Sequence, residues 1–213
     1  MKTLKQLSMI VMCFISLATV VSTATAKTAG SQTSVQAEYK RLLALGDRLA
    51  KIPVERQDRE PHKSFLKKNK KDIVYSEPAG QWFVQADRFW DLAKKNKSLS
   101  IADDIGWTAA NTPLPGECEG YINCYLYNLT ATLGEYLKLF PSGKHRKQAL
   151  SKFNEWTEPM ITDRKTYDGP TEDSDKAELK KMIAVLSDIL GKVNDSGKDA
   201  SVALISRLAD AYK

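Results

Sequence analysis

The chain has 213 residues, of which 32 are basic and 26 acidic, so its formal net charge is +6. This length fits one domain with a substantial core, and the charge is too small to indicate a nucleic-acid partner. It permits attraction to anionic envelope polymers or lipid head groups.

The N-terminus has the parts of a secretory signal peptide. Two lysines precede an apolar run from Leu7 to Val21, and Ala24 and Ala26 supply the small residues of a cleavage site. The run is shorter than the about 20 residues that span a bilayer. We therefore expect cleavage after Ala26, with the remaining 27–213 folded as one domain in the periplasm or outside the cell, without a membrane anchor.

The first part of the mature chain is predicted to contain two helices and a basic stretch. Residues 27–33 are small and polar and are expected to be a disordered lead-in. Apolar residues then recur at helical spacing from 34 to 52. The basic run 56–71 is interpreted as a solvated face rather than a binding patch, since no aromatic residues interleave with its charges. Residues 79–96 are predicted to form the second helix.

The rest of the chain also shows the helical period. Ser100 and Asp103 resemble a capping box that would begin a third helix. Apolar residues from Ile122 to Phe140 predict one long helix, in which Gly134 indicates close packing with a neighbour. A turn at 141–143, a helix ending near Pro159, a polar loop at 162–175 and two last helices complete the prediction.

Cys118 and Cys124 remain after the leader is removed, and an even pair in an exported protein favours a disulfide. Six residues along an α-helix rise about 9 Å, which exceeds the Cα separation of about 7 Å that a disulfide tolerates. Cys118 must then precede the helix and Cys124 lie in its first turn. Only His62 and His145 could add metal ligands, which makes a poor ligand set, so neither a metal nor a cofactor is expected.

Residues 134–145, followed by Ala149 and Phe153, resemble the helix-turn-helix of tetratricopeptide-like repeats in bacterial envelope proteins. The segments near Gly80, Ile101 and Pro115 resemble a family of uncharacterised exported bacterial proteins. These resemblances imply export and antiparallel helical hairpins, but no activity. No second copy follows at a period of 34 residues, so the expected fold is all-α, a tetratricopeptide-like bundle or short solenoid of about six to seven helices.

The sequence identifies no catalytic residue. Acidic residues around Cys118 and on the preceding helix could converge at one rim, either as paired carboxylates of a glycoside hydrolase or as charges that favour helix N-termini. We expect a non-catalytic scaffold that binds another envelope protein or an anionic envelope component. The alternatives are a cell-wall hydrolase and a structural or stress-related protein without a defined ligand. The candidate interaction rim consists of Asp103, Trp107, Glu117, Glu119 and Tyr121.

Overall fold

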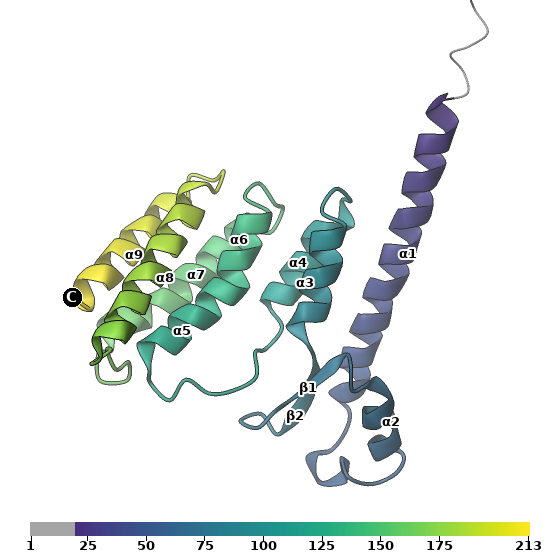
Figure 1. The fold of residues 1–213 in the computed structure, drawn as a ribbon, viewed down its shortest axis with the longest axis horizontal. Coiled ribbons are helices and arrows are strands. Elements are labelled where there is room, and N and C mark those ends of the chain that lie inside the picture. Colours follow the sequence, from purple (N-terminus) through teal and green to yellow (C-terminus); the bar gives the residue numbers. More distant parts are fainter. Residues whose placement is uncertain (1–19) are drawn as a thin grey trace, which may run out of the picture.

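The computed structural model describes residues 20–213, with side chains described from residue 32 on. The fold is mainly helical, with one small two-stranded sheet (Figure 1), which confirms the predicted all-α class. Most of the predicted signal peptide, residues 1–19, lies outside the described residues. No helix within residues 20–213 combines the length and the apolarity that a bilayer crossing requires.

Helix α1 (Val20–Leu49) is the longest helix and stands at one end of the molecule (Figure 1). It includes residues 27–33, where the sequence predicted a disordered lead-in. This stretch contains no proline, and helix formation spreads cooperatively along a chain once one part of it is fixed. The buried residues Val35, Leu42 and Leu49 fix α1 against the rest of the fold.

A β-hairpin replaces the first turns of the helix predicted at 79–96. Strands β1 (Ile73–Ser76) and β2 (Gln81–Val84) pair antiparallel, with Ile73 opposite Val84. Gly80 lies in the connecting turn with φ of 58°, a conformation that glycine adopts without strain. Because the strand β2 ends at Val84, helix α3 begins only at Ala86.

Between α1 and the hairpin lie a 3-10 turn (Val54–Arg56) and helix α2 (His62–Asn69). Leu66 is the buried residue of α2, and its basic residues remain exposed. The basic run predicted at 56–71 therefore covers a short helix and the loop before it.

Three antiparallel helical hairpins follow one another and lie in a row (Figure 1). The middle hairpin begins with a rod in which α5 continues through a π segment into α6. The pairs are α3 (Ala86–Lys95) with α4 (Ile101–Ala110); α5 (Ile122–Leu129), the π segment (Thr130–Gly134) and α6 (Glu135–Leu139) with α7 (Arg146–Thr162); and α8 (Asp173–Gly191) with α9 (Lys198–Ala211).

Neighbouring hairpins pack helix against helix along this row. Helix α4 packs on the π segment and α6, α5 packs on α8, and α7 packs on α9. The hairpins span 86–110, 122–162 and 173–211, and these unequal lengths explain why the sequence shows no fixed period. With the α5–α6 rod taken as one helix, the described residues form eight helices, slightly more than predicted.

Candidate binding groove

An open cavity of about 450 Å³ lies between α1, β2 and the C-terminal half of α4. Its walls are mainly apolar, and aromatic side chains from three different elements contribute to them. These are Trp82 and Phe83 of β2, Phe89 of α3 and Trp107 of α4, accompanied by Leu42, Leu43, Val84 and Pro113. Concave apolar sites with a few placed polar groups are where proteins usually hold ligands, so this groove is the candidate site.

Contacts between distant parts of the sequence hold the walls of the groove in place. The hydroxyls of Tyr39 on α1 and Thr108 on α4 are 2.6 Å apart, and the Tyr39 ring meets Phe89 edge-on at 6.3 Å. On the other wall, Trp82 Nε1 donates to Gln57 Oε1 at 2.9 Å. The groove is therefore bounded by side chains that are fixed before any ligand binds.

Polar groups are few and come from both α1 and the end of α4. Asn111 Nδ2 and Thr112 Oγ1 donate to carbonyl oxygens one turn earlier in α4, at 2.7 and 2.9 Å. Asp47, an exposed residue of α1, supplies negative charge to the lining. The apolar walls together with the Asp47 carboxylate favour binding of an apolar group that has a positive charge beside it.

Trp107 connects the groove to a polar network at the turn between α6 and α7. Its indole stacks on the imidazole of His145, with centroids 5.2 Å apart and 9° between the planes. His145 Nε2 lies 2.9 Å from Asp104 Oδ1, and the Lys144 ammonium also pairs with Asp104. The Tyr136 hydroxyl donates to Asp103 Oδ1 at 2.5 Å.

Electrostatics within this network follow from its hydrogen bonds. Burial and the hydrogen bond to Asp103 raise the pKa of Tyr136. Burial alone would raise the pKa of Asp104, but the hydrogen bonds from Lys144 and His145 outweigh it and lower that pKa. Both ring nitrogens of His145 are taken, by Asp104 and by Gln148 at 3.0 Å, so the network joins α4 to the α6–α7 turn.

Asp103 has a different role from the predicted cap. Ser100 forms no capping hydrogen bond with its side chain. Instead, Asp103 Oδ2 accepts a hydrogen bond from the backbone N–H of Lys144 at 2.7 Å. The capping box predicted from Ser100 and Asp103 is therefore wrong, because the carboxylate finds its partners across the bundle.

The residues of the predicted rim do not form one rim. Asp103 lies in the first turn of α4, whereas Glu117, Glu119 and Tyr121 belong to the connection beyond its other end, residues 111–121 (Figure 1). The Tyr121 hydroxyl donates to Asp175 Oδ2 at 2.7 Å, which raises the pKa of Tyr121 to about 12. Of the five rim residues, Trp107 lines the groove, and the expected convergence of the acidic residues is not observed.

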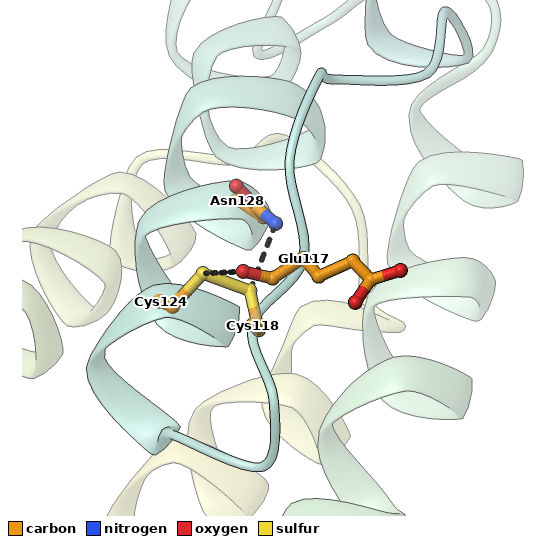
Figure 2. The surroundings of a disulfide bond; sticks show 4 residues. All are labelled: Glu117, Cys118, Cys124 and Asn128. Carbon is orange, nitrogen blue, oxygen red and sulfur yellow. Dashed lines mark hydrogen bonds between the residues drawn. A yellow bond between two sulfur atoms is a disulfide. The ribbon is translucent and has the colours of Figure 1, made fainter. Parts of the chain in front are cut away.

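The disulfide between Cys118 and Cys124 is present, with Cα atoms 5.3 Å apart (Figure 2). Cys118 lies before α5 and Cys124 in its first turn, as the helical rise predicted. Asn128 Nδ2 donates to Cys118 Sγ at 3.3 Å, while the Glu117 side chain points away from the bond (Figure 2). The disulfide thus holds the α4–α5 connection against the start of α5.

Gly120 in the same connection has φ of 87°, and a Cβ there would lie 2.8 Å from the carbonyl oxygen of Thr166. This close approach lets the backbone N–H of Asp168 donate to Gly120 O at 2.7 Å. The α4–α5 connection is therefore also bonded to the polar loop before α8, which leaves it in a structural role.

Sequence reasoning missed the groove. Trp82 and Phe89 were both placed in the helix predicted at 79–96. The adjacency of two aromatic residues after Gly80 was the signal that could have indicated a strand there. Among residues 20–213, no group of three His, Cys, Asp or Glu side chains is placed to hold a metal ion. No family model matches the chain, and searches of curated proteins and of solved structures found no match.

Proposed function

We propose that this chain is an exported, non-catalytic binding protein that holds an apolar segment of a partner protein in its groove. The observation that carries the proposal is the cavity of about 450 Å³ with four aromatic side chains in its walls. Rigid aromatic walls bind apolar side chains with little loss of conformational entropy, and aromatic residues dominate the energetics of such contacts.

The chemistry of the lining narrows the partner. Leu43 lines the groove, and 39% of its surface is exposed. An apolar side chain of a ligand bound in the groove would cover this exposed surface and so remove it from water. Asp47 adds a negative charge beside this apolar surface. The favoured ligand is therefore a peptide segment that combines aromatic or aliphatic residues with a neighbouring lysine or arginine.

The disulfide supports the proposal that the protein is exported. A disulfide such as Cys118–Cys124 persists mainly in oxidising compartments outside the cytosol. The protein is a row of helical hairpins held by this disulfide. Such a rigid structure can present a binding surface to another envelope protein.

A peptide library displayed on phage and selected against the purified protein tests the proposal. We expect selected peptides to carry an apolar pair next to a basic residue and to lose at least tenfold in affinity for the Leu43→Asp variant. Val185→Asp is the matched control, because Val185 is similarly exposed at 41% but lies on α8. Peptides that bind both variants as tightly as the parent protein would show that the groove is not the binding site.

A further inference from the structure

The charges of this protein are separated along the chain. Residues 48–71 contain nine basic and three acidic residues, a net charge of +6, whereas residues 72–213 contain 18 basic and 21 acidic residues, a net charge of −3. The first segment comprises the end of α1, the 3-10 turn and α2, which lie together at one end of the molecule (Figure 1). We refer to the nine basic residues of this segment as the basic end: Arg48, Lys51, Arg56, Arg59, Lys63, Lys67, Lys68, Lys70 and Lys71.

Contacts with the rest of the fold fix the backbone of the basic end. The Arg48 guanidinium lies 4.1 Å from the centre of the Phe65 ring, which joins α1 to α2. Leu66 and Ile52 are buried beneath it. Gln57 Nε2 donates to the carbonyl oxygen of Gly80 at 2.8 Å and so ties the loop to the β-hairpin. The backbone that carries the basic residues is consequently attached to α1 and to the β-hairpin.

Neutralisation of the basic end by the protein itself is not observed. All nine side chains are exposed, and none forms an ion pair with a carboxylate of residues 32–213. By contrast, Arg41 and Arg88 nearby both pair with Asp72 at 2.9 Å. Unpaired like charges repel one another, so the basic end is electrostatically suited to an anionic partner outside the chain.

The exposure of the basic residues, outside the groove, favours one class of anionic partner over another. None of the nine side chains lines the groove. Lys63 and Lys67 of α2 and Lys70 at its C-cap recur at spacings of four and three residues, so they lie on one face. The loop before α2 exposes 55% of the apolar Val54. A folded acidic protein requires a complementary, well-packed surface, whereas mobile lipid head groups adapt to an exposed array of lysines.

We infer that the basic end binds a membrane surface that contains anionic lipids. The sequence alone favoured a solvated face for this run; the charge separation and the missing ion pairs now argue for contact with a membrane. Binding is electrostatic and reversible. Because none of the nine basic side chains lines the groove, the groove stays available to a partner. Each lysine near an anionic membrane contributes roughly a fivefold change in affinity.

Vesicle flotation tests the inference. We expect the purified protein to float with vesicles of phosphatidylcholine and phosphatidylglycerol at a 7:3 ratio in 50 mM salt, to float less in 200 mM salt because the charges are screened, and to remain unbound with phosphatidylcholine alone. The variant Lys63→Glu/Lys67→Glu/Lys70→Glu is expected to lose at least tenfold in apparent affinity.

The matched control changes the net charge by the same amount elsewhere. Lys147, Lys165 and Lys180 are exposed and lie outside the basic end. The variant Lys147→Glu/Lys165→Glu/Lys180→Glu should bind within about twofold of the parent, because charges beyond a Debye length, about 14 Å in 50 mM salt, contribute little. Circular dichroism confirms that both variants are folded. Equal losses in both variants, no binding to anionic vesicles in 50 mM salt, or binding to poly-L-glutamate without vesicle binding would each overturn the inference. Vesicle binding by Leu43→Asp should be unchanged, which separates this test from that of the groove.

Discussion

The hydroxyl of Tyr136 on α6 lies 2.5 Å from Oδ1 of Asp103 on α4, 33 residues earlier in the chain. The Tyr136 hydroxyl oxygen also accepts a hydrogen bond from the backbone N–H of His145 at 3.1 Å. The Tyr136 side chain is fully buried. One side chain therefore connects the first hairpin, the middle hairpin and the turn between α6 and α7.

Tyr136→Phe should destabilise the fold by about 1–3 kcal/mol, since it leaves a buried N–H and a carboxylate oxygen without this partner. Urea unfolding followed by circular dichroism measures the loss. Tyr127→Phe is the control, because Tyr127 is 63% exposed, and it should change stability by less than about 0.5 kcal/mol. Equal stability of the two variants would contradict the prediction.

The raised pKa of Tyr136 also predicts an alkaline effect. In the unfolded chain tyrosine titrates near pH 10, so this contribution is complete below that pH and is lost as the pH rises towards the higher folded value. Above pH 10 the stability of the parent protein should fall by up to about 1.4 kcal/mol per pH unit more than that of Tyr136→Phe. If the free energies of unfolding of the parent and of Tyr136→Phe changed equally with pH between 9 and 10.5, the raised pKa of Tyr136 would be contradicted.

Asp104 predicts an effect at acid pH. Its pKa is lowered because the hydrogen bonds from Lys144 and His145 outweigh the effect of burial. Its contribution is thus present above about pH 4, the usual aspartate value, and is lost as the pH falls through the folded pKa. Asp104→Asn should lower stability at pH 7 by about 1 kcal/mol and make the decline below pH 4 shallower. Asp91→Asn, at an exposed pair with Lys95, should change neither quantity measurably.

Gly134 is required by close packing between the middle and last hairpins. A Cβ at this position would lie 3.1 Å from Leu186 Cδ2 and 3.3 Å from the Leu129 carbonyl oxygen. Gly134→Ala should destabilise by about 1–3 kcal/mol through overpacking, whereas Gly191→Ala meets no atom within 4 Å and should be neutral or stabilising by up to about 1 kcal/mol. A stabilising Gly134→Ala in thermal unfolding would show that Leu186 moves aside freely.

The Cys118–Cys124 bond closes a short loop, so its removal in Cys118→Ser/Cys124→Ser should cost about 2 kcal/mol in the chain-entropy model. Peptide mass mapping without reductant should recover the linked pair from the protein in its native compartment. Free thiols at both positions in that material would contradict the disulfide, and unchanged stability of the double variant would contradict its stabilising role.

Local signals predicted most helices and the disulfide correctly. Apolar spacing locates α4 and α8 without knowledge of their neighbours. Once Cys118 and Cys124 are taken as bridged, the rise of an α-helix places Cys118 outside α5. An extended piece at 73–75 was expected and is confirmed as β1. The second strand, β2, escaped prediction because Trp82, Phe83 and Phe89 all fit the spacing of one helix, although a strand ends between them. Periodicity cannot detect such a break when both elements bury aromatic residues.

The groove could not be predicted from local patterns, because it depends on which elements pack together. Tyr39 and Thr108 meet across 69 residues of sequence, and no spacing rule reports that contact. The separation of Asp103 from Glu117 was missed for the same reason. The two residues were expected to converge, but Asp103 lies in the first turn of α4 and Glu117 lies beyond the last turn of that helix.

The π segment Thr130–Gly134 acts as a phase shift within the α5–α6 rod. Its i→i+5 bonding holds one more residue per turn than an α-helix, so every side chain after it is rotated by about 100° relative to an uninterrupted helix. Because of this rotation, α5 packs against α8 while Tyr136 on α6 forms its hydrogen bond with Asp103 on α4. Deleting one residue from this segment would restore a regular helix and turn Tyr136 away from Asp103, so the alignment of the first two hairpins depends on the number of residues at 130–134 as much as on their identity.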